Sequence, residues 1–127
     1  MNTKCDCLKA LIIENYIEIF KQLKDLVSEV IDIDNILWAS NTEEAVELIN
    51  REMPEVIILD TGLLNNKSYE ILKTIKKNDS KSLVIVLSNT TDIQLEADCL
   101  LYGADYFLDK YNEFDKIPVL ISLQKTV

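Results

Sequence analysis

The chain of 127 residues is long enough for one compact domain with a continuous core, and it leaves no room for a second domain. Apolar residues make up 48% and charged residues 28% of the sequence, which is typical of a globular protein and argues against disorder or a fibrous repeat. The net charge of −9, from 13 basic and 22 acidic residues, would repel a phosphate backbone, so we expect no nucleic-acid binding by this domain.

No apolar run approaches the roughly 20 residues that a membrane-spanning helix needs, and residues 1–9 lack the basic-then-apolar layout of a secretory signal. We therefore expect a cytoplasmic protein without membrane association. Cys5, Cys7 and Cys99 are an odd number and lack the second Cys or His pair of a zinc site, so ordinary reduced thiols are expected. The sequence contains no histidine, which excludes histidine bases and histidine metal ligands.

Short apolar stretches bounded by polar or turn residues are predicted to be β-strands. These stretches cover residues 8–13, 36–40, 56–60, 83–88 and 106–108. Most of them are apolar on both faces, which is expected of a parallel sheet buried between two layers of helices.

Helical periodicity fills the segments between the predicted strands. The apolar positions with this spacing are Ile17, Phe20, Leu23, Val27 and Val30 in the first helix, Ala45, Leu48 and Ile49 in the second, and Ile71, Leu72 and Ile75 in the third. Asn41 and Glu44 have the spacing of a capping box at the start of the second helix, and Met53 with Pro54 ends it.

The last two helices are predicted from their caps. Asp92 opens the fourth helix, and Tyr102 with Gly103 ends it in the manner of a glycine C-cap. Asn112 is predicted to cap the fifth helix, with Pro118 early enough to kink or restart it.

Alternating strands and helices over this length predict right-handed crossovers and a doubly wound α/β sandwich. We expect a flavodoxin-like (βα)5 fold with a five-stranded parallel sheet in the order 2-1-3-4-5, formed by one domain over residues 1–127. Ligands bind to such sheets outside the carboxyl ends of the strands, where the strand order reverses. The residues at the strand ends are therefore the candidates for a functional site.

Polar side chains of complementary chemistry follow the predicted strands. They are Glu14 and Asn15 after the first strand, Asp60 at the end of the third, Ser88 at the end of the fourth and Lys110 after the fifth. A carboxylate, an acid-amide pair, a hydroxyl and an ammonium each have a task in phosphoryl transfer, where catalysis is mostly positioning and neutralisation of charge.

Asp60 is the candidate nucleophile, since its carboxylate can attack phosphorus and form an acyl phosphate. Glu14, Asn15 and Asp60 would hold Mg²⁺, a hard cation that prefers oxygen ligands. The Ser88 hydroxyl would donate a hydrogen bond to one phosphoryl oxygen, and Lys110 would form a charge-assisted bond to another.

The segments that carry these residues resemble the response-regulator receiver family, the phosphoacceptor part of bacterial two-component signalling. The resemblance runs through ALIIEN at 10–15, VIILD at 56–60, VIVLS at 84–88 and GADYFLDK at 103–110, and covers nearly the whole chain. Each segment alone is weakly specific, whereas the four together are specific.

The resemblance implies a phosphoprotein in which Asp60 accepts a phosphoryl group from a histidine kinase or a phosphotransfer protein. Such a domain promotes its own phosphorylation and dephosphorylation and is not a multiple-turnover enzyme. By the same resemblance, Lys110 is the active-site lysine, Ser88 the switch hydroxyl, Phe107 the aromatic switch residue and Gly62 a backbone carbonyl ligand of Mg²⁺. The face of the fourth helix, fifth strand and fifth helix is then expected to form a homodimer or to dock a target.

The sequence departs from the family pattern at several positions. Asn15 replaces a second acid, which removes a charge from the metal site and predicts weaker Mg²⁺ binding. Asn89 stands where a small residue usually follows the switch hydroxyl and could crowd the entry of a phosphodonor. Leu64 and Tyr111 stand where prolines are usual, which mainly affects the rigidity of the loops.

Other interpretations of these residues stay open. Taken singly, Asp60 could cap a loop, Lys110 could be a solvated surface cation, and Phe107 could be ordinary core. A degenerate receiver that is not phosphorylated and acts as a protein-interaction module is favoured mainly by Asn15. A flavin-binding domain of the same fold is disfavoured because the loop at 14–16 lacks a phosphate cradle rich in Ser, Thr or Gly. The chain could be a stand-alone receiver or part of a longer protein.

Overall fold

The structure, a computed structural model, describes residues 8–61, 68–78, 81–89 and 92–125. Within these ranges the strands are β1 (Ala10–Ile13), β2 (Ile36–Ala39), β3 (Val56–Asp60), β4 (Leu83–Ser88) and β5 (Tyr106–Asp109). The helices are α1 (Ile17–Val27), α2 (Thr42–Glu52), α4 (Ser68–Asn78), α5 (Ile93–Leu101) and α6 (Lys116–Lys125), with a short 3₁₀ helix η1 (Ile33–Asn35) before β2. None of the helices in these ranges has the length and apolar character needed to cross a bilayer.

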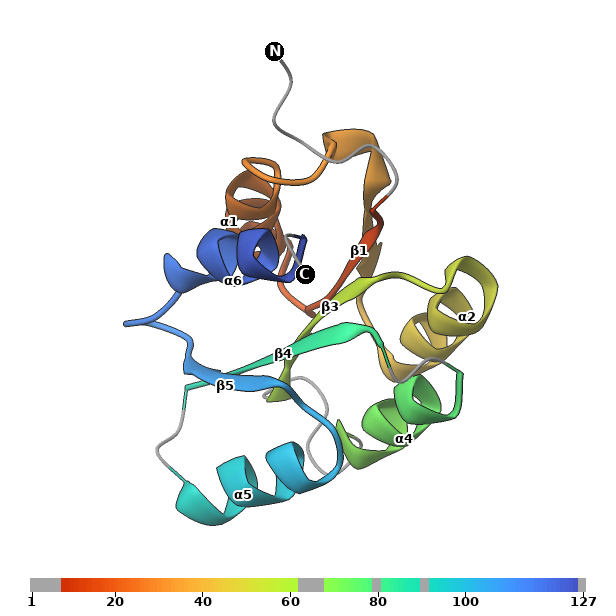
Figure 1. The fold of residues 1–127 in the computed structure, drawn as a ribbon, viewed down its shortest axis with the longest axis vertical. Coiled ribbons are helices and arrows are strands. Elements are labelled where there is room, and N and C mark those ends of the chain that lie inside the picture. Colours follow the sequence, from red (N-terminus) through yellow and green to blue (C-terminus); the bar gives the residue numbers. More distant parts are fainter. Residues whose placement is uncertain (1–7, 62–67, 79–80, 90–91, 126–127) are drawn as a thin grey trace.

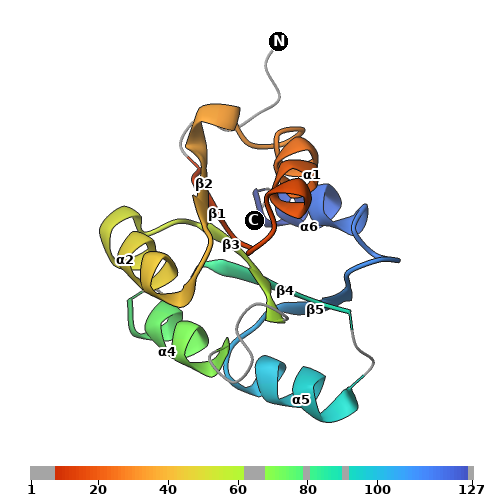
Figure 2. The ribbon, with the colours of Figure 1, turned by 180° about the vertical axis from the view of Figure 1, so that it is seen from behind.

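The strands form one parallel sheet in the order β2-β1-β3-β4-β5 (Figure 1). The predicted doubly wound fold and its strand order are therefore confirmed. Helices α1 and α6 lie side by side on one face of the sheet, and α2, α4 and α5 cover the other face, as the view from behind also shows (Figure 2). All the strands run in the same direction, so their carboxyl ends meet at one edge of the sheet.

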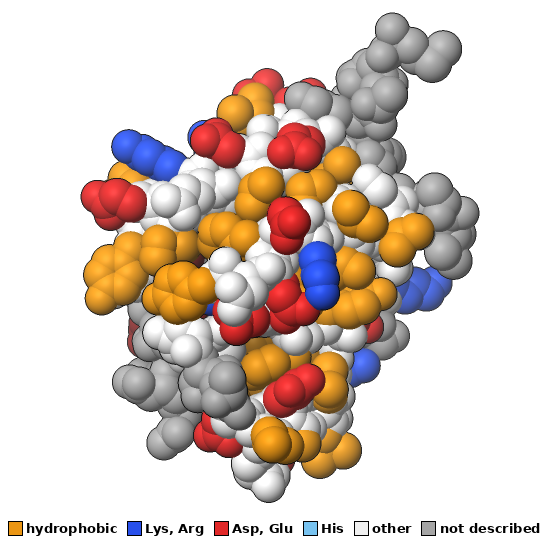
Figure 3. Space-filling model, turned by 90° about the vertical axis from the view of Figure 1, so that its left-hand side faces the viewer, with side chains coloured by type: hydrophobic (Ala, Val, Ile, Leu, Met, Phe, Trp, Pro, Cys, Tyr) orange, Lys and Arg blue, Asp and Glu red, His pale blue; other side chains and the backbone are white. Residues whose placement is uncertain are grey.

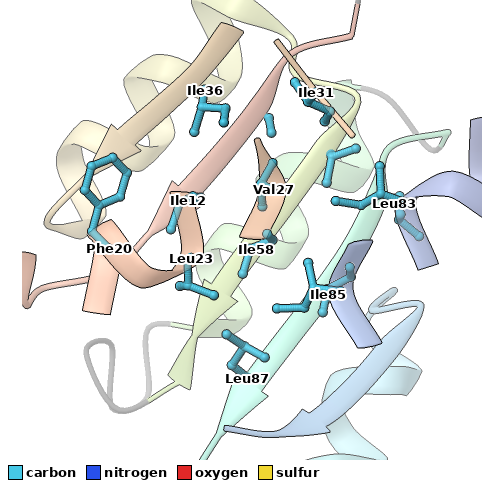
Figure 4. Packing of buried hydrophobic residues seen from close by; sticks show 14 of the residues in the cluster. Ile12, Phe20, Leu23, Val27, Ile31, Ile36, Ile58, Leu83, Ile85 and Leu87 are labelled. Carbon is cyan, nitrogen blue, oxygen red and sulfur yellow. The ribbon is translucent and has the colours of Figure 1, made fainter. Parts of the chain in front are cut away.

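Two apolar clusters, one on each face, hold the layers together. Figure 4 shows the first cluster, in which Leu23 and Val27 of α1 pack over Ile12, Ile58 and Ile85 of the sheet. The second cluster joins the sheet to α2, α4 and α5 and contains Leu11, Ile13, Ile57, Leu59, Ile71, Ile75 and Val86. Because successive strand residues point to opposite faces, both faces of each central strand must be apolar, which explains the unbroken apolar runs of the sequence.

Most of the predicted helix caps are confirmed. The side chain of Asn41 accepts a hydrogen bond from the backbone N–H of Glu44 at 2.8 Å, while the Glu44 carboxylate accepts from the backbone N–H of Ser40 at 2.8 Å. Asp92 caps α5, and Gly103 ends it with a positive φ of 115°. Left-handed backbone of this kind favours glycine because it has no Cβ.

The prediction that Asn112 caps the last helix is wrong. Helix α6 begins at Lys116, since the Asp109 carboxylate accepts hydrogen bonds from the Asn112 backbone N–H and from its side-chain amide, both at 3.2 Å. These bonds hold the segment after β5 in turns instead of a helix. Pro118 is then the third residue of α6, where its missing N–H removes no helical hydrogen bond.

Smaller differences concern the ends of elements. The first predicted strand loses two residues, since β1 begins at Ala10, and β5 extends one residue further, to Asp109. Val30 lies in a turn beyond the end of α1. Cys5 and Cys7 lie outside the described residues. Cys99 is a buried free thiol whose pKa is raised to about 11 by burial and by the nearby charge of Asp98, so it is unreactive near neutral pH.

Candidate functional site

The carboxyl edge of the sheet brings together four residues that the sequence singled out. Glu14 follows β1, Asp60 ends β3, Ser88 ends β4 and Lys110 follows β5. Their exposed fractions are only 1%, 4%, 0% and 8% respectively. Charged side chains are rarely buried to this extent unless they are paired, so their burial indicates a built cluster and argues against a solvated surface lysine.

Lys110 joins the two carboxylates of the cluster. Its ammonium donates to Oδ2 of Asp60 and lies 3.3 Å from Oε1 of Glu14. Burial of the ammonium works against its charge, but the hydrogen bond to Asp60 and the charges of both acids outweigh burial, and the pKa of Lys110 is raised. Lys110 therefore stays cationic at the bottom of the site.

The two carboxylate oxygens of Glu14 differ in their surroundings. Its Oε2 accepts a hydrogen bond from the backbone N–H of Asn15 at 2.9 Å. Its Oε1 is buried and, within the part of the chain that the structure describes, accepts no hydrogen bond. Burial raises the pKa of Glu14 to about 7, and the neighbouring Asp60 carboxylate adds to this while Lys110 opposes it. Near neutral pH Glu14 is therefore present in both protonation states, and once it is ionised one ammonium stands against two carboxyl groups.

Two buried carboxyl groups beside one ammonium fit a divalent cation, whose charge would favour the ionised form of Glu14. Among the described residues no group of three or more His, Cys, Asp or Glu surrounds one point, so Glu14 and Asp60 are the charged ligands available there. The side chain of Asn15 is exposed beside them, and Gly62 lies outside the described residues. Mg²⁺ commonly takes one or two carboxylates and keeps several waters, so the described residues fit such an ion with the reduced charge expected from Asn15.

Ser88 is tied to the backbone that carries the lysine. Its carbonyl oxygen accepts a hydrogen bond from the N–H of Lys110 at 2.8 Å, and it pairs in register with Asp109. In the neighbouring pair of strands, Asp60 lies opposite Leu87, one residue before Ser88. Sheet register therefore fixes the order of Asp60, Ser88 and Lys110 along this edge.

Phe107 lies on β5, opposite Val86, and is half-buried. Its ring packs against the cluster that joins the sheet to α2, α4 and α5. The predicted switch residue thus contacts the layer that contains α5, and part of its ring is exposed.

Two departures from the family pattern, Asn89 and Tyr111, lie at the surface. Asn89 is exposed at the end of β4, Tyr111 is 73% exposed, and Leu64 lies outside the described residues. A cavity of about 160 Å³ beside Lys110 is lined by Ile19, Gln22, Tyr111 and Phe114, between α1 and the turn that follows β5. Asn89 and Tyr111 therefore stand at the surface and not inside the cluster.

The surface of α5, β5 and α6 carries exposed apolar side chains. Leu101 is 80% exposed, Val119 59% and Leu123 57%, and Tyr106 of the edge strand β5 is also exposed. Figure 3 faces the side of the molecule on which α1, α5 and α6 lie, and it shows hydrophobic side chains interspersed with acidic ones. Exposed apolar patches of this kind are typical of interaction sites.

Residues that sequence reasoning missed also support the site. The indole N–H of Trp38 donates to the backbone oxygen of Glu14 at 2.7 Å, and the backbone N–H of Asp109 donates to the carboxylate of Glu113 at 2.7 Å. The signals were present but weak: a buried indole N–H needs an acceptor, and an aspartate before polar residues favours a turn. Neither signal identifies the residue that forms the hydrogen bond.

The family model described as "Response regulator receiver domain" matches residues 10–122 of the chain. The probable C4-dicarboxylate response regulator DctR of Bacillus subtilis is 31% identical over 104 residues, which cover 81% of this chain and 46% of that protein. The probable transcriptional regulator ycf27 of Guillardia theta is 32% identical over 102 residues, covering 80% of this chain and 39% of that protein. The chain therefore spans less than half the length of these curated relatives.

The fold is similar to solved structures at low sequence identity. A response regulator from Thermotoga maritima has a TM-score of 0.80 at 19% identity, covering 94% of this chain and 98% of that one. A two-component response regulator from Clostridium difficile has a TM-score of 0.79 at 21% identity, covering 94% and 96%. At these identities the likeness concerns the fold.

Proposed function

This chain belongs to the response regulator receiver family of two-component signalling, and we propose that Asp60 accepts a phosphoryl group from a histidine kinase or phosphotransfer protein in a Mg²⁺-dependent reaction. The observation that carries the proposal is the burial of the Asp60 carboxylate against the Lys110 ammonium, with Glu14 beside both. Family membership replaces the flavin-binding interpretation of the sequence. We further propose that the protein acts in the cytoplasm, where its donors would be found.

In the proposed reaction an oxygen of Asp60 forms a bond to phosphorus while the bond between phosphorus and the donor nitrogen breaks, and the electron pair of that bond stays on nitrogen. Lys110 would transfer part of its hydrogen bonding from Asp60 to a phosphoryl oxygen and so neutralise charge that builds up there. Glu14, Asn15, Asp60 and the backbone carbonyl of Gly62 would hold Mg²⁺, which supplies positive charge to the remaining phosphoryl oxygens.

The response to phosphorylation would pass along β4 and β5. A phosphoryl group on Asp60 would attract the Ser88 hydroxyl, and Phe107 would turn further into the cluster beneath α5. The exposed apolar surface of α5, β5 and α6 would then form a homodimer or bind a target. This is the face that the sequence resemblance assigns to output.

The decisive experiment is incubation with acetyl phosphate, with and without Mg²⁺, followed by intact mass measurement. We expect the wild-type protein to gain one phosphoryl group only with Mg²⁺, and the Asp60→Asn variant to gain none. Asp115→Asn is the matched control, since it makes the same chemical change at an exposed position and should label like wild type. Labelling of Asp60→Asn to the wild-type extent would exclude Asp60 as the acceptor.

Ser88→Ala tests the proposed route of the response. We expect the variant to take up phosphate on Asp60 largely as wild type does, and to show a weaker change in the amide NMR signals of Phe107 and α5. Beryllofluoride with Mg²⁺ can replace the unstable acyl phosphate in this measurement. If labelled Ser88→Ala protein changed as fully as wild type, the route through this hydroxyl would be wrong.

A second candidate function is that of a degenerate receiver, a protein-interaction module that takes no phosphate. Two features favour it. The Glu14-Asn15 pair carries one negative charge fewer than two acids would, and the Lys110 ammonium already bridges Asp60 and Glu14. This candidate predicts neither mass gain with acetyl phosphate nor any spectral change with beryllofluoride and Mg²⁺. The same mass measurement therefore separates the two functions.

A further inference from the structure

Trp38 is the one tryptophan of the sequence, and the proposed chemistry gives it no role. It lies on the edge strand β2, whereas Glu14, Asp60 and Lys110, called the acid-lysine cluster below, follow or end β1, β3 and β5. Its side chain is half-buried, and its indole N–H donates a 2.7 Å hydrogen bond to the backbone oxygen of Glu14. Trp38 thus binds the backbone of Glu14, the acidic member of the Glu14-Asn15 pair.

Among the residues that the structure describes, three hydrogen bonds hold Glu14, and β2 supplies two of them. The backbone N–H of Glu14 donates to the carbonyl of Ala39 at 3.0 Å, and its backbone oxygen accepts from Trp38. The third bond is the one from the Asn15 N–H to Oε2. With the backbone held on both sides and one carboxylate oxygen bound, Oε1 is left facing Lys110 at 3.3 Å. The position of Oε1 therefore depends on contacts with β2.

The Trp38 ring also contacts the helix that follows the loop. It stacks on Phe20 of α1, with ring centroids 4.7 Å apart and an angle of 12° between the planes. The N–H of Phe20 donates to the carbonyl of Tyr16 at 2.9 Å, at the start of this helix. A single side chain thus connects the beginning of the β1–α1 loop to its end, which restricts the conformations of the loop.

We propose that Trp38 is a positioning residue of the metal site: its indole N–H holds the backbone of Glu14 so that Oε1 stays beside the Lys110 ammonium that binds Asp60, where it can ligate a divalent cation. The inference rests on the proposed function. Asn15 gives this role more weight, because Glu14 is then the only charged member of the pair. A site with fewer charges depends more on how well the remaining ligand is placed.

The N–H bond and the ring stacking can be separated by two substitutions. Trp38→Phe keeps an aromatic ring for Phe20 and removes the indole N–H, whereas Phe20→Leu removes the stacking and leaves the N–H in place. A residue that only fills the core predicts similar effects of both variants, in proportion to the stability that each loses. A positioning residue predicts that only Trp38→Phe affects Glu14.

The first readout is the Kd of Mg²⁺ measured by calorimetry without phosphodonor. We expect Trp38→Phe to raise this Kd by about two- to tenfold, the worth of one neutral hydrogen bond. Phe20→Leu should change it by less than about twofold. Equal effects of the two variants, or an unchanged Kd in Trp38→Phe, would overturn the positioning role.

The second readout needs no metal and separates the failure of this inference from failure of the proposed function. Amide hydrogen exchange without Mg²⁺ should be about fivefold or more faster for Asn15 in Trp38→Phe, while Ile58 in the core of β3 should be unaffected. If wild-type protein bound no Mg²⁺ at millimolar concentration, the proposed metal chemistry would fail, and the exchange rate of Asn15 would still decide the role of Trp38. If the exchange rate of Asn15 were unchanged in Trp38→Phe, Trp38 would have no positioning role, whether or not the protein binds Mg²⁺.

Discussion

The two edges of the acid-lysine cluster are held in different ways. Glu14 is held from β2 by Trp38, 24 residues away in sequence, through a bond that is partly buried. Lys110 is held across the sheet by a single backbone bond, from its N–H to the carbonyl of Ser88 at 2.8 Å, and otherwise by its own neighbours. The Asp109 carboxylate accepts from the N–H of Tyr111 at 2.8 Å, and the Asp109 N–H donates to Glu113 at 2.7 Å. The acid edge thus has a side-chain bond from a distant strand, whereas the side-chain bonds of the lysine edge lie within one turn.

This difference suggests where the site can move. The bonds around Asp109 are mostly exposed, and exposed hydrogen bonds compete with water, so each contributes little to rigidity. Backbone hydrogen bonds from Tyr111 and Asn112 lower the pKa of Asp109, which keeps this carboxylate ionised and able to accept them near neutral pH. Phe107 lies on β5, the strand that leads into this turn, so the proposed switch residue belongs to the less firmly held edge.

The largest effect should follow from removing the ammonium that joins the edges. Lys110→Met leaves the Asp60 and Glu14 carboxylates buried without their counter-charge, and we expect it to lower the free energy of unfolding by about 3–5 kcal/mol at about pH 8. Urea unfolding followed by Trp38 fluorescence measures this change. Adding Asp60→Asn to the variant should restore much of the loss, because one of the two buried charges is then removed.

We expect Lys110→Met to act by leaving buried carboxylates unpaired. The control is therefore the same substitution at an exposed lysine. Lys116→Met removes the ion pair with Glu113, whose atoms lie 2.6 Å apart on the surface, and should have little effect. Equal stability of wild type and Lys110→Met at about pH 8 would show that the two edges do not depend on each other.

The next effect is a pH dependence that belongs to the acid edge alone. The pKa of Glu14 is about 7 in the folded protein against 4.5 for an ordinary glutamate, so between these values the folded state keeps a proton that the unfolded state has released. The free energy of unfolding should therefore fall as the pH rises from 4.5 to 7, by up to about 3 kcal/mol, and then stay level.

Glu14→Gln should remove this slope, since an amide does not titrate. The measurement is a series of urea unfolding curves at pH values above about 5, because the carboxyls with lowered pKa, such as Glu44 and Glu113, lose their stabilising charge only at lower pH. At the lysine edge Asp109→Asn should leave the slope unchanged. A slope that persisted in Glu14→Gln would assign the titration to another group.

The fold could be predicted from the sequence because its signals are local. Strands such as 83–88 are apolar on both faces, and Asn41, Asp92 and Gly103 carry cap chemistry that acts within a few residues. Parallel topology then brings the strand ends to one edge, so the positions of Glu14, Asp60, Ser88 and Lys110 followed from strand order without any knowledge of distances.

The wrong prediction concerns a residue for which two local structures compete, and the missed contact joins residues that lie far apart in the sequence. Asn112 could have capped a helix, but its N–H donates to the carboxylate of Asp109, three residues earlier. The sequence alone does not indicate which of these two residues determines the local structure. The bond between Trp38 and Glu14 requires β1 and β2 to be paired in register, with Ile13 opposite Ala39. Contacts of this kind need the structure.

A smaller effect is expected from loosening the lysine edge. Asp109→Ala removes the acceptor for the N–H groups of Tyr111 and Asn112, so the Lys110 ammonium should spend less time beside Asp60. We expect labelling of Asp60 by acetyl phosphate to slow by at most about tenfold, with the Kd of Mg²⁺ unchanged. Asp115→Ala is the control. A weaker Mg²⁺ affinity in Asp109→Ala would mean that the two edges are coupled through the backbone.

The smallest effect concerns Tyr111, at a position where the family usually has proline. Proline has no N–H, so Tyr111→Pro loses the 2.8 Å bond to Asp109, whereas Tyr111→Ala keeps it. We expect the proline variant to label Asp60 more slowly by at most about threefold, and the alanine variant to label at the wild-type rate. If proline instead raised both the labelling rate and the Tm, backbone stiffness would matter more at this edge than the Asp109 bond, and the two edges would differ less than their hydrogen bonds indicate.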